Sequence, residues 1–346
     1  MANWYKRWYN VDLDPATEIQ PLIGSKEGIL HVTLAFVNPG DQVLVPNPGY
    51  PTYTSLNKIL GSEIVNYNLR EDNGWQPDFD ELEKIDLSRV KLMWTNYPNM
   101  PTGALASEEV YARLVDFGRR HGILICNDNP YSFILNDKPL SVLACLRAKE
   151  CCLELNSLSK AHNMAGWRIG MVAGAADVVS EILKVKSQMD SGMFKPLQLA
   201  AVEALSQGPE WFEELNAEYR RRRVLAGEIF DLIGAEYDHE SSGMFLWGRI
   251  GLPVDSIDPR HHSSGAVASY GRGCENSNSG HPSAQSAEQR ISIGQQVSDR
   301  LLYEAGVFIT PGFIFGKNGE NYIRISLCAK PEVLKRAAEK IRAIIE

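Results

Sequence analysis

The sequence predicts an α/β protein with a mostly parallel central sheet, helices on both faces and a smaller α+β domain toward its C-terminal end. Three apolar strands carry this prediction, because each runs into a loop rich in proline or glycine: QVLVPNPGYPTY, KLMWTNYPNMPTG and GILICNDNPYSF. Between the last two lies VYARLVDFGRRHG, in which Val110, Leu114, Val115 and Phe117 have helical spacing and Gly122 ends the helix. Strand, helix and strand in this order form the βαβ unit of a parallel sheet.

Two domains are expected, a large one over 1–222 and a small one over 223–346. A long charged helix, EWFEELNAEYRRRRVLAGEIFDLIG, leads from the first to the second, which contains GMFLWGRI, GVFITPG, YIRISLC and a closing helix, PEVLKRAAEKIRAIIE. Residues 252–297 are rich in Ser, Gly, Asn and His and lack apolar periodicity, so they are predicted to form a disordered or irregular loop. His261 and His262 in this loop have no matching Cys/His spacing, and no metal site is predicted.

Composition excludes several classes of protein. The 346 residues are 44% hydrophobic and 23% charged, which is typical of a globular chain long enough for two domains. A net charge of −8 without a basic tract argues against nucleic-acid binding, and no apolar run is long enough to cross a membrane. The start, MANWYKRWYNVDLD, does not read as a signal peptide, and the six cysteines form no CxxC pair. We therefore expect a cytoplasmic protein.

The stretch LNSLSKAHNMAGWRIGMVAG reads as strand, loop and strand, with Lys160 where the first strand ends. A lysine with a lowered pKa is a nucleophile toward carbonyl carbons and forms Schiff bases. Nearby Ser157, Ser159 and Arg168 offer hydroxyl donors and a guanidinium fork that suit a phosphate.

Two loops near the N-terminal end carry further candidates. In IGSKEGI, Ser25 and Lys26 precede a predicted helix, whose free N–H groups would form an anion site; an ordinary N-cap at Ser25 is the alternative. In PNPGYPTY, Tyr50 or Tyr53 could stack on a flat ligand, and plain packing is the alternative.

Three charged or polar candidates complete the set. In NDNPYSF, Asp128 and Tyr131 follow a strand, and a pyridinium N–H would suit the carboxylate, although Asp128 could also be a turn residue. In NYIRISLC, Arg324 lies inside an apolar strand, where a substrate carboxylate or an internal ion pair would have to partner it. Together these residues would suit pyridoxal phosphate, which has an aldehyde for a lysine, a phosphate for an arginine and a ring nitrogen for an aspartate.

These motifs resemble the class I/II aminotransferases, the fold-type-I enzymes that use pyridoxal phosphate, and most of all the branch with aspartate, alanine and LL-diaminopimelate aminotransferases. The resemblance covers nearly the whole chain from about residue 4, apart from residues 252–297. The motifs that carry it are GSKEG, PNPGYPTY, YPNMPTG, NDNPY, SLSKAHNMAGWRIG, GMFLW and YIRIS.

The resemblance implies a role for each candidate. Lys160 would hold the cofactor covalently and later move a proton. Ser25 and Lys26 would hold the phosphate through their backbone amides, with Ser157 and Arg168 completing the phosphate site. The remaining assignments are that Tyr50 stacks on the pyridine ring, Asp128 pairs with the ring nitrogen, Tyr131 bonds the phenolic oxygen and Arg324 binds the substrate α-carboxylate.

The chain departs from the family in three places. The family reads Asn-Pro-Thr-Gly, with that Asn also bonding the phenolic oxygen, where this chain has Met100 preceded by Asn99. We expect either Asn99 to replace that bond or Tyr131 to act alone. The family also has some tens of residues ahead of the segment matching ANWYKRWYN, including a strip that closes over the substrate, and its connection at 252–297 is shorter.

The implied activity is transfer of an amino group between an L-amino acid and a 2-oxo acid by a ping-pong mechanism. Another pyridoxal-phosphate reaction, such as cysteine-S-conjugate β-elimination, and a catalytically impaired cofactor-binding paralogue are the alternatives. The family also implies a homodimer with the active site at the subunit interface. DSGMFKPLQLAAVEAL is a candidate interface segment, and a core helix is the alternative reading.

Overall fold

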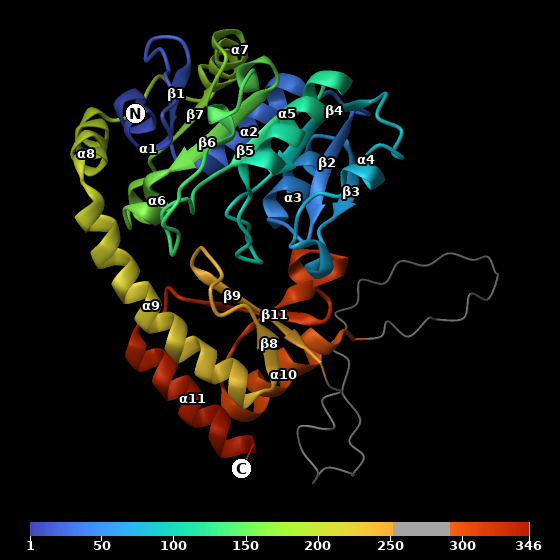
Figure 1. The fold of residues 1–346 in the computed structure, drawn as a ribbon, viewed down its shortest axis with the longest axis vertical. Coiled ribbons are helices and arrows are strands. Elements are labelled where there is room, and N and C mark those ends of the chain that lie inside the picture. Colours follow the sequence, from blue (N-terminus) through green and yellow to red (C-terminus); the bar gives the residue numbers. More distant parts are fainter. Residues whose placement is uncertain (252–290, 346) are drawn as a thin grey trace, which may run out of the picture.

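A seven-stranded sheet forms the centre of the large domain in the computed structural model, which describes residues 1–251 and 291–345 (Figure 1). The strand order is β1-β7-β6-β5-β4-β2-β3, and β2 through β6 run parallel, whereas β7 is antiparallel to both of its neighbours. The strands are β1 (Ile19–Leu22), β2 (Gln42–Asn47), β3 (Glu63–Asn68), β4 (Val90–Thr95), β5 (Leu124–Asp128), β6 (Cys152–Ser157) and β7 (Gly170–Gly174). The predicted mostly parallel sheet is confirmed.

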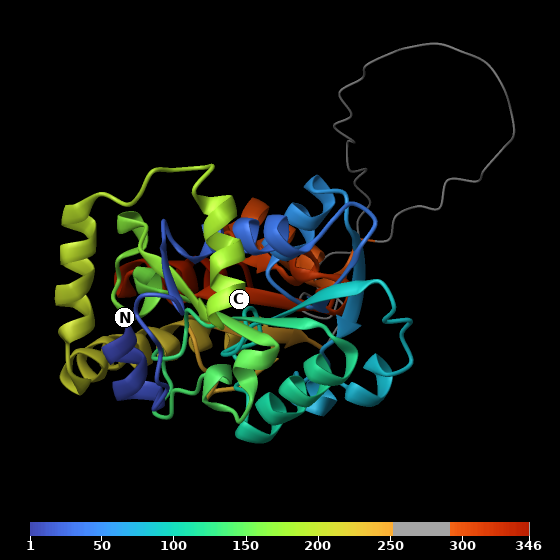
Figure 2. The same cartoon turned by 90° about the horizontal axis from the view of Figure 1, so that it is seen from above.

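Helices cover both faces of this sheet, as the view from above shows (Figure 2). One buried cluster joins the sheet to α2 (Ser25–Phe36), α3 (Pro51–Ile59) and α7 (Ala176–Lys186). A second cluster, on the other face, involves α1 (Ala2–Tyr9), α4 (Phe79–Leu82), α5 (Glu108–His121) and α8 (Lys195–Ser206). The parallel strands are therefore buried on both sides, which is why they read as continuous apolar runs.

The helix predicted between the strands at 90–95 and 124–128 is confirmed as α5. Ser107 caps its start by accepting a hydrogen bond from the backbone N–H of Val110 at 3.2 Å. Gly122 ends it with a φ of 64°, a conformation that costs glycine little and most other residues much more. This helix returns the chain so that β5 lies beside β4.

In its described residues, the small domain is an antiparallel four-stranded sheet, ordered β10-β11-β9-β8, packed against three helices (Figure 1). Its elements are α9 (Pro209–Leu232), β8 (Ala235–Tyr237), β9 (Phe245–Ile250), α10 (Ile293–Ala305), β10 (Thr310–Pro311), β11 (Tyr322–Ser326) and α11 (Pro331–Ile345). The boundary expected between residues 222 and 223 falls inside α9, which runs from the large body to the small one without a break.

Part of the loop expected at 252–297 needs correction. Residues 252–290 lie outside the described part of the chain, but α10 already begins at Ile293. Ser292 caps it by accepting from the N–H of Gln295 at 3.3 Å, and Val297 and Leu301 bury one face of the helix. The first turn, IGQQV, is too short and polar for its helical period to stand out from the preceding residues.

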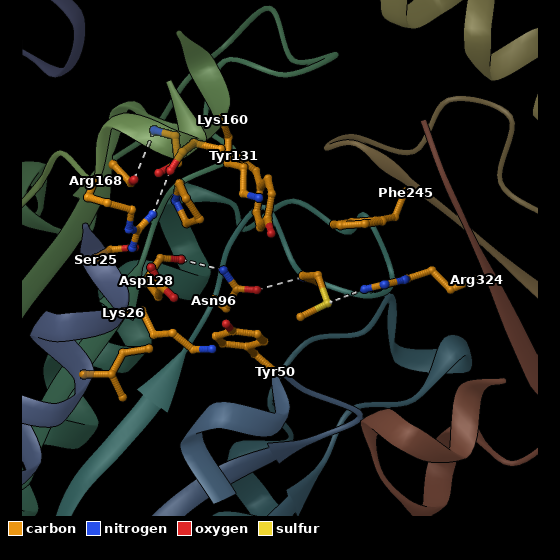
Figure 3. Close-up of a pocket in the computed structure, with 16 residues that line it drawn as sticks. Ser25, Lys26, Tyr50, Asn96, Asp128, Tyr131, Lys160, Arg168, Phe245 and Arg324 are labelled. Carbon is orange, nitrogen blue, oxygen red and sulfur yellow. Dashed lines mark hydrogen bonds between the residues drawn. The ribbon is translucent and has the colours of Figure 1, made fainter. Parts of the chain in front are cut away.

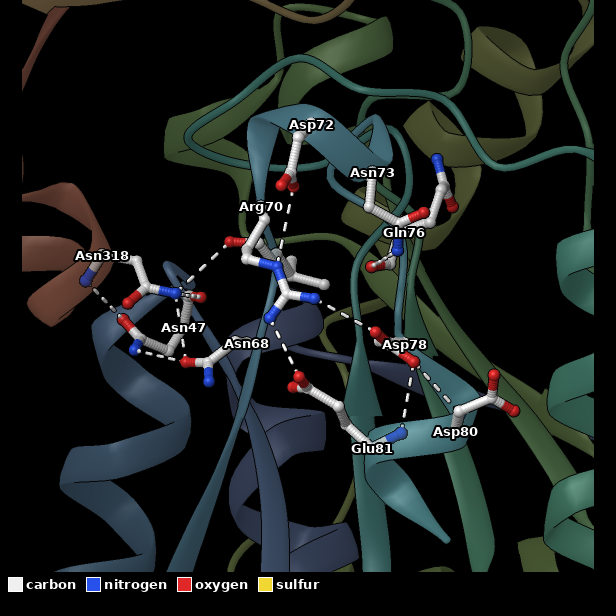
Figure 4. Close-up of polar contacts among 11 residues, drawn as sticks. Asn47, Asn68, Arg70, Asp72, Asn73, Gln76, Asp78, Asp80, Glu81 and Asn318 are labelled. Atoms are coloured by element: carbon white, nitrogen blue, oxygen red, sulfur yellow. Dashed lines mark hydrogen bonds and ion pairs between the residues drawn. The ribbon is translucent and has the colours of Figure 1, made fainter. Parts of the chain in front are cut away.

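The two domains meet through a small network of asparagines (Figure 4). Asn318, in the 3-10 helix Lys317–Gly319 between β10 and β11, donates from its side-chain amide to the backbone oxygen of Asn47 and to Oδ1 of Asn68, both at 3.1 Å. Its backbone N–H donates to Oδ1 of Asn47 at 3.1 Å. Asn47 and Asn68 are the last residues of β2 and β3. These bonds therefore attach the small domain to the carboxyl ends of the parallel strands.

Candidate active site

A cavity of about 340 Å³ lies where the parallel strands end and the small domain faces them (Figure 3). Every site residue predicted from the sequence lines it except Asn99. The lining residues are Ser25, Lys26, Ile29, Tyr50, Asn96, Met100, Asp128, Pro130, Tyr131, Ser157, Ser159, Lys160, Ala165, Arg168, Phe245 and Arg324. Most of them follow β2, β4, β5 and β6, as expected at the carboxyl edge of a parallel sheet.

Lys160 is held by a single helical turn, α6 (Leu158–Ala161), directly after β6. The hydroxyl of Ser157 caps this turn by accepting from the N–H of Ser159 at 3.1 Å, and it donates to the backbone oxygen of Ile169 at 3.3 Å. Ser157 is buried and Lys160 is partly exposed to the cavity. The amine of Lys160 forms no ion pair with any of the residues that the structure describes.

Three backbone features meet at the predicted phosphate site. Gly24 precedes α2 with a φ of 80°, which favours glycine, and a Cβ built on it would lie 2.1 Å from Nη2 of Arg168 and would displace the guanidinium. Gly170 is similarly close, because its Cβ would lie 2.6 Å from the backbone nitrogen of Ser25. No side chain caps the first turn of α2, whose N–H groups and dipole therefore offer an anion site beside the guanidinium of Arg168.

Asp128 is buried at the end of β5. Its Oδ2 accepts a hydrogen bond from the hydroxyl of Tyr53 at 3.0 Å, whereas its Oδ1 is buried and has no partner among the residues that the structure describes. Burial raises the pKa of Asp128 to about 7, against a smaller lowering by the Tyr53 hydroxyl and by Lys160. Tyr53 itself is stacked on Trp94, with ring centroids 5.0 Å apart, so it supports the carboxylate from the protein interior.

Two tyrosines frame the same cavity. Tyr50 is the N-cap residue directly before α3 and packs edge-on against Tyr53, while Nζ of Lys26 lies 5.8 Å from the centre of the Tyr50 ring. Tyr131 is 8% exposed, and its phenol has its pKa raised by burial and by the nearby carboxylate of Asp128. A flat ligand above Tyr50 would therefore have a neutral phenol donor, that of Tyr131, within the same cavity.

The expectation that Asn99 faces the cofactor is not met. The carbonyl of its side chain accepts from the hydroxyl of Thr102 at 2.8 Å, and its amide donates to the backbone of Asn96 at 3.2 Å, so the local turn uses both ends. Asn96 lines the cavity instead, and the sequence reasoning missed it. Its amide donates to the backbone oxygen of Asp128 at 2.6 Å. Its position directly after β4 was the signal that could have identified it.

Arg324 enters the cavity from β11 of the small domain (Figure 3). Its guanidinium carbon lies 4.0 Å from the ring centre of Phe245 and 4.5 Å from that of Phe315. Burial lowers the pKa of Arg324 to about 10, and its Nε is buried with no partner in residues 1–251 and 291–345. No carboxylate among the described residues pairs with it, so the predicted alternative of an internal ion pair is not found there.

The residues present fit pyridoxal phosphate. The unpartnered Oδ1 of Asp128 requires a donor, and a pyridine N–H would supply one. Ser25, Ser157 and Arg168 line one cavity beside the uncapped start of α2, and together they offer a phosphate hydroxyl, guanidinium and backbone N–H donors. Lys160 provides a primary amine for an aldehyde in the same cavity. In residues 1–251 and 291–345, no cluster of metal-ligating side chains is found, and no helix there has the length and apolar character to cross a membrane.

Comparison with known proteins agrees with this geometry. The family model for aminotransferases of class I and II matches residues 1–341. Curated relatives include LL-diaminopimelate aminotransferases of Aquifex aeolicus, 39% identical over 99% of this chain and 79% of the relative, and of Moorella thermoacetica, 37% identical over 100% and 79%.

Solved structures give the same result. The structure of apo-BacF from Bacillus subtilis superposes with a TM-score of 0.84 at 33% identity, covering 99% of this chain and 82% of that one. An aminotransferase from Staphylococcus aureus gives a TM-score of 0.82 at 28% identity, covering 99% and 81%. The chain belongs to the class I and II aminotransferases and is a fold-type-I, pyridoxal-phosphate-dependent aminotransferase.

Proposed function

We propose that Lys160 holds the cofactor covalently, that Asp128 and Tyr131 tune it, and that Arg324 binds the α-carboxylate of an L-amino acid. The arrangement around one cavity supports this assignment. Lys160 lies at one end beside Ser25 and Arg168, and Arg324 lies at the other beside Phe245 (Figure 3). An amine for the reaction and an unpaired cation for a carboxylate therefore face the same space.

Each residue has a defined task. Bound pyridoxal phosphate supplies an aldehyde for attachment and a ring that accepts electrons from the substrate Cα. The Nζ of Lys160 would take up the Cα proton of the amino acid. Asp128 would keep the ring nitrogen protonated, since a positive partner beside a buried carboxylate favours the ionised form of each. Tyr131 would donate its hydroxyl to the phenolic oxygen. The phosphate would be held by Ser25, Lys26, Ser157 and Arg168, and Tyr50 would pack on the ring.

For the substrate, the support comes from the curated relatives. Those between 35% and 39% identical are named LL-diaminopimelate aminotransferases, and the chain covers 79% of the Aquifex aeolicus enzyme. We therefore take LL-diaminopimelate as the amino acid that this chain uses, with a 2-oxo acid as acceptor.

An absorbance titration of the cofactor-loaded protein tests the reaction and the substrate together. The panel is LL-diaminopimelate, its meso isomer, aspartate, alanine and a cysteine S-conjugate, each added without a 2-oxo acid. We expect the visible band to disappear stoichiometrically with LL-diaminopimelate and to return when 2-oxoglutarate is added. Release of pyruvate from the S-conjugate, with no exchange between amino and oxo acids, would contradict transamination and favour β-elimination. A band that no member of the panel changes would indicate cofactor binding without activity.

A homodimer is also part of the proposal. Phe194 is 70% exposed just before α8, and Leu199 and Val202 on that helix are exposed as well, which gives an apolar face of the kind that oligomers bury. Light scattering over a dilution series should give twice the mass of 38.6 kDa at high concentration. A monomer at every concentration would contradict it.

The proposed location is the cytoplasm. The cysteines in the described residues are all free thiols, as expected in a reducing compartment.

A further inference from the structure

Glu154 is a buried carboxylate on β6 that the proposed function does not use. The residue is 0% exposed, and each of its two oxygens accepts two hydrogen bonds. Oε1 accepts from the hydroxyls of Tyr5 at 2.9 Å and Ser141 at 2.8 Å. Oε2 accepts from the side-chain amide of Asn127 at 3.0 Å and from the backbone N–H of Val142 at 3.1 Å. Donors from α1, from β5 and from residues 141–142 therefore converge on one side chain.

This set of partners favours the ionised form of Glu154. The backbone N–H of Val142 can only donate. The side-chain oxygen of Asn127 accepts from the hydroxyl of Thr95 at 3.1 Å, which leaves the amide nitrogen of Asn127 to donate to Glu154. A protonated carboxyl would need an acceptor where these two donors point. Burial raises the pKa of Glu154, and its hydrogen bonds oppose that rise.

No lysine, arginine or histidine forms an ion pair with this carboxylate within residues 1–251 and 291–345. The ionisable groups that face it are Tyr5 and Tyr9 of α1, Tyr111 of α5 and Cys145. Burial raises the pKa of each of these groups, and the charge of Glu154 adds to the rise, so they stay neutral near pH 7. Glu154 is therefore a buried negative charge whose field acts on other groups close to it.

The charge of Glu154 acts on Asp128. Asp128 follows Asn127 on β5, and Asn127 pairs with Glu154 across β5 and β6. Burial is the main cause of the raised pKa of Asp128, and the charge of Glu154 adds to it. A proton or a cation at Asp128 relieves the repulsion between the two buried carboxylates. The other ionisable groups that face Asp128 are Tyr53, Tyr131 and Lys160.

We propose that Glu154 is a positioning residue that acts through Asp128: held by Asn127, its charge makes a proton or a cation bind more tightly at the Asp128 carboxylate. A cofactor whose ring nitrogen carries a proton is such a cation, and for the cofactor this inference rests on the proposed role of Asp128. Glu154 does not line the active-site cavity, so it acts without touching the ligand.

The ionisation of Asp128 can be followed without cofactor. In the cofactor-free protein, the stability gained by Asp128→Asn rises with pH and levels off once Asp128 is ionised in the folded state, above about pH 7 in wild type. Glu154→Gln and Glu154→Leu both remove the charge, and each should move that point to lower pH by on the order of one unit. Tyr5→Phe and Ser141→Ala each remove one hydrogen bond to Glu154 and keep its charge, so they should leave the point in place. Thermal unfolding over a series of pH values measures the gain in each background.

Two results would overturn the inference. One is a point that does not move in Glu154→Gln and Glu154→Leu. The other is an equal displacement in Tyr5→Phe and Ser141→Ala, because it would indicate loosened packing rather than a lost charge. The two Glu154 variants share only the loss of charge, so either one decides the matter if the other does not fold.

Binding of pyridoxal phosphate separates this inference from the proposed function. We expect Glu154→Gln to bind the cofactor about tenfold more weakly than wild type, as a shift of one pH unit implies. A displaced point for Asp128 with unchanged cofactor affinity would uphold the action of Glu154 on Asp128 and contradict the pairing of Asp128 with the ring nitrogen.

Discussion

Replacing Asp128 by asparagine should raise the stability of the cofactor-free protein against unfolding and lower that of the cofactor-loaded protein. In the cofactor-free protein the carboxylate is buried, and within the described part of the chain one of its oxygens has no partner while the other accepts a hydrogen bond from Tyr53. Burial raises its pKa to about 7, so ionising it inside the protein is unfavourable. Asparagine keeps the shape and an acceptor for Tyr53 but cannot ionise.

The size of the effect follows from linkage between ionisation and folding. An acid whose pKa is higher in the folded than in the unfolded state lowers the stability of the fold as the pH rises from the unfolded pKa through the folded pKa. For Asp128 the unfolded pKa is near 3.9 and the folded pKa is about 7. The difference between these two pKa values destabilises the folded protein by about 4 kcal/mol at pH 8 and by about 1.5 kcal/mol at pH 5. The gain of Asp128→Asn over wild type should therefore be large at pH 8 and smaller by roughly 2–3 kcal/mol at pH 5.

Thermal unfolding of the cofactor-free wild-type and variant proteins at both pH values measures this. Asp137→Asn, at an exposed position, is the matched control and should show no pH-dependent gain. Addition of pyridoxal phosphate should reverse the order, because wild type gains a charged partner that the variant cannot match. A gap between wild type and variant that is the same at pH 5 and pH 8 would show that the carboxylate is not held unpaired in a buried site.

Three further predictions concern Lys160, Arg324 and the junction between the domains. Lys160→Ala should lack the visible absorbance of the covalent adduct and all transamination; a borohydride-reducible adduct at another lysine in this variant would refute the assignment. Arg324→Ala should raise KM by an amount equivalent to about 2–4 kcal/mol while the cofactor still binds. Arg324→Lys should restore only part of the lost substrate affinity, because an ammonium cannot form the bidentate contact. An unchanged KM in Arg324→Ala would argue against the substrate role. Asn318→Ala removes the side-chain bonds of Asn318 to Asn47 and Asn68 and should lower stability by roughly 1–3 kcal/mol in thermal unfolding. Asn73→Ala, whose amide bonds only its own loop, should have little effect; equal effects would mean that the Asn318 bonds do not stabilise the junction.

The sequence was sufficient for the elements with strong local signals. β2, β4 and β5 are continuous apolar runs followed by Pro/Gly loops, and α5 has both a cap and a terminating glycine, so these were predicted. β1 was not, because it is four residues long and contains Pro21, which argues against a strand. Its position at the edge of the sheet explains why the proline is tolerated, and that position depends on pairing with distant β7.

For the site, strand ends in a parallel sheet indicate which loops bind the ligand, but they do not indicate which side chain of a loop turns inward. Asn96 and Asn99 are three residues apart in the loop after β4, and both are buried. The hydrogen bonds of Thr102 to Asn99 turn that side chain into the loop and leave Asn96 on the cavity, an outcome decided by the turn itself. The setting of Arg324 lay further beyond prediction, since Met100, Phe245 and Phe315 reach it from three separate parts of the chain. The sequence shows that an arginine lies in this strand, but not whether a carboxylate of the protein pairs with it. Only the neighbours that the fold brings to Arg324 decide between an internal ion pair and a cation that is free to bind a ligand.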